Sequence, residues 1–452
     1  ELVNELTGIV EWPKAYLGNI DNEFMDIPKE VLSSAMRKHQ RYLALFNSDN
    51  SLSSKYIIIS NIDNKDSGTR VIKGNDRVLR ARLSDAKFFW DQDKKVSLEV
   101  RVNDLKDRVF QSKLGTLFDK AKRLEKLAEI ISKFIPNANS QDATRAALLC
   151  KSDLLTGVVG EFPDLQGQMG YYYSKNDGEN ESVSQAIRDH YKPVGPLDKT
   201  PNNPDSICLS ITDKIDTIVG FFGISQMPSG SKDPYALRRS TLGIIRIIIE
   251  NRLSLKLKNI ILQSHKQYNG VLEKDNNELA NLIISFANDR LRVFLKDKGV
   301  NSGVINAVFS SGDDLLDTYD RVLALRKFLD TSEGKDLLFA YRRAVNIVYI
   351  EEKKENINFL SIDNIVNLDN QYARDLEEIL TKLESEIDDK LNSHDFDQVL
   401  TLLSLLKVPI NSYLDNVIVN VEDVQIKRTN LWLLSRVGRI MDKVANFSKI
   451  EG

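Results

Sequence analysis

Residues with the types and spacing that catalysis requires are sparse in this chain. Its four histidines, His39, His190, His265 and His394, are scattered along the sequence. Catalytic and metal sites usually appear as clusters of histidine, cysteine or carboxylate residues at ligand spacing. The sequence therefore predicts no metal site and no catalytic residue in this chain.

One dipeptide, His394-Asp395, is of the kind that HD phosphohydrolases use to bind a metal. No second histidine lies upstream in the same predicted group of helices, so the ligand set would be incomplete. We interpret Asp395 as the entry residue of a helix, because aspartate is a favoured helix N-cap, with an incidental histidine beside it.

Phosphate-binding loops are also missing from the sequence. It contains no Gly-x-x-x-x-Gly-Lys-Ser/Thr loop and no Gly-x-Gly-x-x-Gly after a predicted strand. The segment Ser229–Lys232 precedes a predicted helix and could hold an anion through backbone N–H groups and the Lys232 side chain. A plain capped turn explains the same residues, and both interpretations remain open.

Basic residues gather in two places. The first stretch contains Arg70, Lys73, Arg77, Arg80, Arg82 and Lys87. In the second, Arg238 and Arg239 follow Lys232 at a helix start. Such stripes are compatible with contacts to nucleic-acid phosphates, and a solvated helix face explains their spacing equally well.

The composition limits the class of protein. With 452 residues the chain should form two to four domains, and its net charge of −3 does not indicate a partner by itself. The longest apolar run, Leu242–Ile249, is interrupted by Arg246 and is too short to span a bilayer. The only cysteines, Cys150 and Cys208, lie in apolar helical patterns, which favours a reducing compartment such as the cytoplasm.

The periodicity of the chain predicts a mainly α protein with several domains. Strand signals occur in His39–Phe46 and Lys55–Ser60, on either side of an Asn/Asp/Ser loop. From Asn75, a predicted N-cap, nearly every segment has helical periodicity. We therefore divide the chain into a short α/β part with a hairpin and helix at 1–95 and helical parts at 96–250, 251–330 and 331–452.

Four features locate individual helices and surfaces. Ser140 is a predicted N-cap, and Asp233-Pro234 predicts a helix over Tyr235–Glu250, because aspartate caps helices and proline favours the first helical position. Between about 351 and 400 the helices become strongly acidic, which indicates a solvated face or a spacer. The helices from Phe396 to the end carry several lysines and arginines.

Four long segments together resemble the β subunit of bacterial heterotetrameric glycyl-tRNA synthetase. They run in family order across almost the whole chain and are Glu5–Pro13, Gly74–Trp90, Gly160–Gly170 and Ser229–Arg239. The end of the chain, Phe396–Ile450, is also similar to the helical, DALR-like anticodon-binding module of arginyl-type synthetases. Most of the family's N-terminal domain is absent, and the chain starts with Glu1, so we expect an N-terminally truncated piece.

The resemblance implies a function and a division of labour. In this family the α subunit uses glycine and ATP, with Mg²⁺, and the β subunit holds the tRNA in an expected α2β2 assembly, so this chain would bind no cofactor. It would position tRNA(Gly) for glycylation and would be inactive alone. The alternative from another class is a free-standing helical RNA-binding or scaffold protein that carries an anticodon-binding module.

The resemblance also implies site residues. The middle helices would form an HD-like fold whose metal core would be sought at Asp153, Asp213 and Asp216, yet histidines are missing near them in the sequence. A metal-dependent hydrolase is therefore a third possible function, and it is disfavoured. The tRNA contacts are expected at Lys232, Arg238, Arg239, Tyr341, Arg342, Arg343, Asn346, Lys427 and Arg428, because Arg and Lys contact phosphates and polar side chains read unpaired bases.

Overall fold

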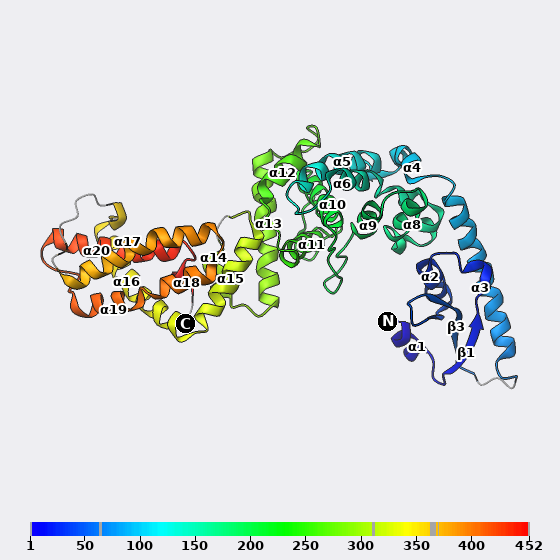
Figure 1. The fold of residues 1–452 in the computed structure, drawn as a ribbon, viewed down its shortest axis with the longest axis horizontal. Coiled ribbons are helices and arrows are strands. Elements are labelled where there is room, and N and C mark those ends of the chain that lie inside the picture. The colour runs from blue at the N-terminus through cyan, green and yellow to red at the C-terminus, as the bar shows by residue number, and fades with distance from the viewer. Residues whose placement is uncertain (1, 63–65, 310–311, 362–367, 369, 451–452) are drawn as a thin grey trace. The chain divides into compact units, whose positions relative to one another are not determined.

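The structure is a computed structural model that describes residues 2–62, 66–309, 312–361, 368 and 370–450 (Figure 1). It contains 67% helix and 6% strand, which confirms the prediction of a mainly α protein. The chain divides into two compact units, which we call the first unit (Glu1–Ile247 and Asn259–Leu279) and the second unit (Ile248–Lys258 and Ala280–Gly452). The division into four parts stays a prediction.

The first unit begins with a small sheet and continues with helices. Its strands are β1 (Lys14–Asn19), β2 (Leu43–Phe46), β3 (Leu52–Ser60), β4 (Val109–Gln111) and β5 (Gly115–Thr116). Its helices are α1 (Leu2–Ile9), α2 (Lys29–Gln40), α3 (Thr69–Asp93), α4 (Leu98–Asp104), α5 (Leu117–Ser132), α6 (Ser140–Leu149), α7 (Gly157–Glu161), α8 (Gln168–Asn176), α9 (Glu181–Asp189) and α10 (Pro204–Gly223). Helices α11 (Leu237–Glu250), α12 (Leu257–Lys266) and α13 (Asn276–Asp297) contain residues of both units.

The N-terminal sheet has three antiparallel strands in the order β1-β3-β2. The sequence predicted only the β2–β3 hairpin, and it placed the start of the first strand at His39, which lies in α2. Strand β1 was missed because its residue types do not follow its burial: the apolar Leu17 is exposed, whereas Lys14 and Gly18 lie on the more covered face. Gly18 is required by close packing, since an added Cβ would lie 2.4 Å from the Tyr56 ring.

Helix α3 starts six residues before the predicted N-cap. It begins at Thr69, so Asn75 lies inside the helix, where its side-chain amide donates to the carbonyl of Val71. The carboxylate of Asp93 at the other end accepts hydrogen bonds from the backbone of Gly157 and from the hydroxyl of Tyr173. These bonds tie α3 to the helices that follow it.

Helices α5, α6, α9 and α10 form the core of the first unit by packing on one another. Thr116 and Asp119 form a capping box at the start of α5, and the buried residues of α5 recur at three- and four-residue spacing, as an amphipathic helix requires. Helix α10 is buried along nearly its whole length and starts at Pro204 behind the N-cap Asn203. For α6 the N-cap is Asn139 and not Ser140, since the Asn139 side chain accepts from the first free backbone N–H groups.

The second unit is a helical bundle. Its further helices are α14 (Ser302–Val308), α15 (Leu315–Leu329), α16 (Ser332–Glu355), α17 (Gln371–Asn392), α18 (Phe396–Ser404), α19 (Lys407–Asn416) and α20 (Val424–Asp442). Helices α16, α17, α18, α19 and α20 lie side by side (Figure 1), and α16 packs on both α19 and α20. Among the described residues, no helix combines the length and apolar character needed to cross a membrane.

Candidate functional site

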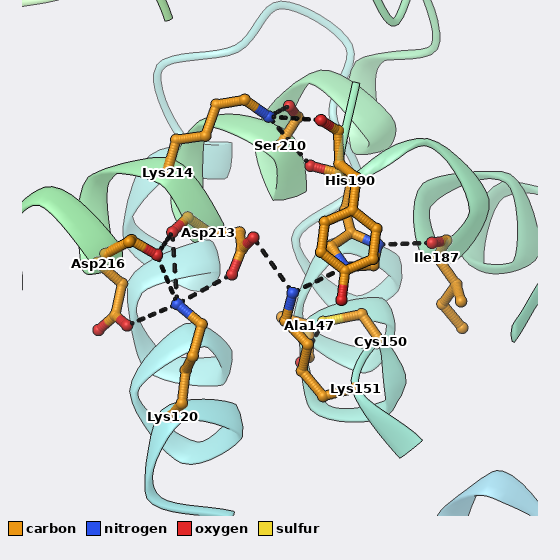
Figure 2. Close-up of polar contacts among 12 residues, drawn as sticks. Lys120, Ala147, Cys150, Lys151, Ile187, His190, Ser210, Asp213, Lys214 and Asp216 are labelled. Atoms are coloured by element: carbon orange, nitrogen blue, oxygen red, sulfur yellow. Dashed lines mark hydrogen bonds and ion pairs between the residues drawn. The ribbon is translucent and has the colours of Figure 1, made fainter. Parts of the chain in front are cut away.

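A cluster of buried charges lies where α5, α6, α9 and α10 meet (Figure 2). It contains four cations and two carboxylates, which are Lys120, Arg123, Lys151, Lys214, Asp213 and Asp216, together with His190. We call these seven residues the buried charge cluster. Charges this deeply buried must be paired or hydrogen bonded, because removing an ion from water costs several kcal/mol.

The two carboxylates hold the cations from α5. The Lys120 ammonium lies 3.0 Å from Asp213 Oδ1 and 3.0 Å from Asp216 Oδ2, and Arg123 Nε lies 2.8 Å from Asp216 Oδ1. Burial acts to raise the pKa of Asp216, but Lys120 and Arg123 outweigh it and hold that pKa below its usual value. Asp216 is therefore ionised throughout the physiological pH range.

Lys151 joins Asp213 to His190. Its ammonium lies 3.2 Å from Asp213 Oδ2 and 2.9 Å from His190 Nε2. Because an ammonium group has no acceptor, Nε2 must be the accepting nitrogen, and Nδ1–H then donates to the carbonyl of Ile187 at 2.6 Å. Burial, followed by the charge of Lys151, lowers the pKa of His190, so the imidazole is neutral.

The Lys214 ammonium is hydrogen bonded mainly to backbone carbonyls. Its ammonium donates to the carbonyls of Lys192 and His190 at 2.8 and 3.2 Å and to Ser210 Oγ at 2.8 Å. Burial lowers the pKa of Lys214 to about 8. Lys214 thus connects α10 to the end of α9 and to the loop that follows it.

Asp153 lies close to the cluster but has a different role. Its Oδ2 accepts from the backbone N–H groups of Gly167 and Gly170 at 2.6 and 3.1 Å. A Cβ at Gly170 would meet Ile187 Cγ2 at 2.6 Å, so only glycine brings that N–H close to the carboxylate. Burial raises the pKa of Asp153 to about 6, against the opposing effect of these hydrogen bonds.

Histidines are missing near Asp213 in the sequence, but one lies close to it in the folded chain. His190 is distant in sequence, but the end of α9 brings it into the cluster. Among the residues that the structure describes, no three His, Cys, Asp or Glu side chains are grouped as metal ligands. The ammonium groups of Lys120 and Lys151 lie against the carboxylates that a metal would need, so these residues do not fit a metal ion.

The His394-Asp395 dipeptide has the structural role that we expected. Asp395 is the N-cap of α18, and its side chain accepts from the backbone of Gln398 at 3.2 Å. His394 Nδ1 lies 2.8 Å from Asp317 Oδ1. The dipeptide belongs to the second unit, so it is not part of the buried charge cluster.

The predicted contacts at Lys232, Arg238 and Arg239 differ from one another in the structure. Helix α11 begins at Leu237 and not at Tyr235, and the Asp233 carboxylate accepts from the backbone of Leu237 and Arg238. An anion would therefore compete with Asp233 for these N–H groups. Arg238 donates to the carbonyls of Gly230 and Lys232, whereas Lys232 and Arg239 have exposed side chains.

The predicted contact residues on α16 also differ in whether an RNA could reach their side chains. Tyr341 is buried and packs on Phe447 with ring centroids 5.6 Å apart, so the expectation that it contacts RNA was wrong. Arg342 donates to the carbonyl of Ile450, and Arg343 binds Asp415 on α19 at 2.8 Å. Asn346 is exposed.

Lys427 and Arg428 lie in the first turns of α20, behind the N-cap Asp423. The Lys427 ammonium binds Glu351 Oε2 at 2.6 Å and Glu355 Oε1 at 2.8 Å, and Arg428 lies 4.0 Å from Glu355. A phosphate would compete with these carboxylates for both cations. Their assignment to tRNA binding stays a prediction.

The acidic stretch is more than a solvated face or a spacer. On α17, Glu384 binds Arg439 at 2.8 Å and Arg436 at 3.3 Å, and Asp388 binds Lys443 at 2.7 Å. The acidic helix therefore neutralises much of the basic face of α20. From the sequence we expected that face to be a separate RNA-binding surface. Exposed cations that have no such partner among the described residues lie elsewhere, at Arg70, Lys73, Arg77 and Arg82 on α3, whereas Arg80 and Lys87 pair with Asp21 and Asp26.

Sequence reasoning missed Lys120, Arg123 and Lys214 as internal residues. A signal was present: Lys120 and Arg123 fall on the same helical face as the apolar residues Ala121 and Leu124 of their helix. A cation on an apolar face predicts a buried partner, because lysine and arginine are almost never fully buried unless paired. The identity of that partner could not be read from the sequence.

Both units are mainly helical. The first contains the buried charge cluster, and each carries exposed cationic side chains. A family model described as glycyl-tRNA synthetase beta subunit matches residues 1–310. The chain therefore belongs to the family of glycyl-tRNA synthetase β subunits.

Curated relatives agree with this family over nearly all of the chain. The glycine–tRNA ligase beta subunit of Rhodospirillum centenum is 42% identical over 457 residues, covering 100% of this chain and 63% of the relative. Those of Phenylobacterium zucineum and Rickettsia africae are 40% and 41% identical, covering 100% and 99% of this chain and 65% of each relative. The chain thus spans just under two thirds of the length of these relatives.

Proposed function

We propose that this chain is the tRNA-handling region of a glycyl-tRNA synthetase β subunit, which positions tRNA(Gly) for ATP-dependent glycylation carried out with an α subunit. The observation that carries the proposal is the match of residues 1–310 to the family model, which makes a free-standing RNA-binding or scaffold protein the less favoured function. An α2β2 assembly in the cytoplasm is part of the proposal. The two buried free cysteines, Cys150 and Cys208, agree with a reducing compartment.

We further propose that residues 96–250 are an HD-like domain that has exchanged metal chemistry for a structural role. In the buried charge cluster, Lys120 and Lys151 supply the positive charge beside Asp213 and Asp216. Residues 331–452 are proposed to be the DALR-like anticodon-binding domain. Long helices suit this task because they present phosphate-binding and base-reading side chains at regular intervals on a rigid support.

The function is tested by mixing the chain with an α subunit and measuring glycylation of tRNA(Gly). We expect glycylation only when both are present. The chain alone should not catalyse glycine-dependent ATP–pyrophosphate exchange, since it has no recognisable phosphate-binding loop. Robust exchange by the pure chain would contradict the assignment as a tRNA-handling subunit.

The proposed loss of metal chemistry has its own test. We expect elemental analysis of the purified chain to find no stoichiometric transition metal. A tightly bound metal, together with phosphatase activity that a chelator removes, would revive the hydrolase as the function of the middle helices.

A further inference from the structure

Helix α16 exposes a stripe of aromatic and polar side chains on one face. Phe339, Tyr349 and Ile350 are 65%, 54% and 52% exposed, and Lys335, Asn346 and Lys353 are exposed beside them. With 3.6 residues per turn, these six residues fall within an arc of about 100° and extend over about 27 Å of the helix. We call them the α16 stripe.

The charge of the α16 stripe is entirely positive. The acidic residues of α16 lie outside this arc, and several are already neutralised: Asp336 binds Lys407, and Glu351 binds Lys354 and Lys427. Within the described part of the chain, no hydrogen bond or ion pair engages the side chains of Lys335 or Asn346. The stripe therefore attracts a polyanion and has polar groups ready to bind it.

The aromatic residues give the α16 stripe a second property. The Lys353 ammonium lies 4.6 Å above the Tyr349 ring, so a cation already stands beside one aromatic face. Phe339 is ten residues earlier on the same face, about 15 Å along the helix. Exposed rings stack on unpaired bases regardless of their identity, and an asparagine between them can hydrogen bond to base edges.

We propose that the α16 stripe is the platform on which the unpaired loop bases of the tRNA stack, with Phe339 and Tyr349 as stacking residues and Asn346 as a base-reading residue. This inference rests on the proposed tRNA-handling function. A protein partner fits the stripe less well, because lysine is depleted from the cores of protein interfaces and here interrupts the apolar side chains. The α16 stripe would supply base contacts in addition to the phosphate contacts expected at Lys427 and Arg428 on α20.

The test measures binding of the chain to two RNAs, the anticodon stem-loop of tRNA(Gly) and the same stem closed as a duplex without the loop bases. Phe339→Ala combined with Tyr349→Ala should weaken stem-loop binding at least about tenfold, since each stacked base is lost separately. Binding of the closed duplex should not change. The salt dependence of stem-loop binding should also persist in this variant, because stacking releases no counterions.

One further variant is a matched control, and another tests the phosphate contacts of the α16 stripe. Tyr372→Ala removes a 41% exposed aromatic residue from α17 of the same unit and should leave stem-loop binding unchanged. Lys335→Ala combined with Lys353→Ala should reduce the slope of log affinity against log salt by about 1.4, as expected for two phosphate contacts to a single strand. Thermal unfolding of each variant checks that these surface changes leave the fold intact.

The outcomes separate failure of this inference from failure of the proposed function. If the unchanged chain binds neither tRNA(Gly) nor its stem-loop, the proposed function itself is wrong. If it binds both and the Phe339→Ala, Tyr349→Ala variant binds equally well, the inference about the α16 stripe is wrong. If the Phe339→Ala, Tyr349→Ala variant binds the stem-loop normally but no longer associates with the α subunit, the α16 stripe is a protein-docking face, and the inference is also wrong.

Discussion

The two units both place acidic side chains against basic ones, but in opposite surroundings. In the first unit, Asp216 and its cationic partners are buried on α5 and α10. In the second unit, the pairs between α17 and α20, such as Glu384 with Arg439, are partly open to solvent. The comparison shows that the same residue types build an interior in one unit and an adjustable surface in the other, since a buried charge cannot exchange its protein partner for water.

The largest expected effect comes from breaking the buried pairing. Asp216→Ala leaves Lys120 and Arg123 without their shared carboxylate, and we expect the free energy of unfolding of the first unit to fall by about 3–5 kcal/mol. Urea unfolding measures the change. The control is Asp388→Ala on α17, which should cost less than about 1 kcal/mol because its pair is exposed. Equal losses in both variants would contradict the distinction.

A second effect depends on pH. Burial raises the pKa of Asp153 to about 6, above its unfolded value of 3.8, so between these values the native chain holds a proton that the unfolded chain releases. The contribution of Asp153 is fully present below the unfolded pKa and is lost as pH rises through the folded pKa, by about 3 kcal/mol in total. Asp153→Asn cannot titrate. Its stability relative to the unchanged chain should therefore rise between pH 4 and pH 6, and a constant difference over that range would show that Asp153 is not protonated in the native chain.

A third effect tests whether surface pairs can exchange partners. Lys427→Ala combined with Arg428→Ala should weaken tRNA(Gly) binding by about 1 kcal/mol or more and lessen its salt dependence, as the loss of phosphate contacts does. The measurement is the Michaelis constant for tRNA in the assembled enzyme. A normal Michaelis constant would mean that Lys427 stays with Glu351 and Glu355 when RNA is bound. Loss of glycine activation would equally contradict this placement of the tRNA contacts.

The smallest effect is expected from a single exposed pair. Arg439→Ala removes the contact with Glu384 across α17 and α20, and the free energy of unfolding of the second unit should change by about 0.5 kcal/mol or less. Unfolding at high salt should abolish even this difference, because salt screens exposed charges. A difference that persists at high salt would indicate that the pair is shielded from solvent.

The sequence by itself determined the helical class and the family. Apolar residues at three- and four-residue spacing predict α5 because that spacing places them on one face, and long segments such as Gly74–Trp90 carry the family resemblance. Helix starts were less predictable. Asn75 and Ser140 are suitable caps, but the chain uses Thr69 as the first residue of α3 and Asn139 as the cap of α6, where the Asn139 backbone N–H also donates to Asp205 of α10.

Only the tertiary structure decided which charges meet. His190 and Lys120 are far from Asp213 in the sequence, and it is the packing of α5, α9 and α10 that brings them within reach of one another. In the same way, the sequence of α20 predicts a basic RNA-binding face. In the folded chain, α17 packs against that face and supplies Glu384 and Asp388 as partners of its cations. Helical periodicity determines which face a side chain occupies, but the element opposite that face, and therefore whether a cation remains available to a phosphate, is set by long-range packing.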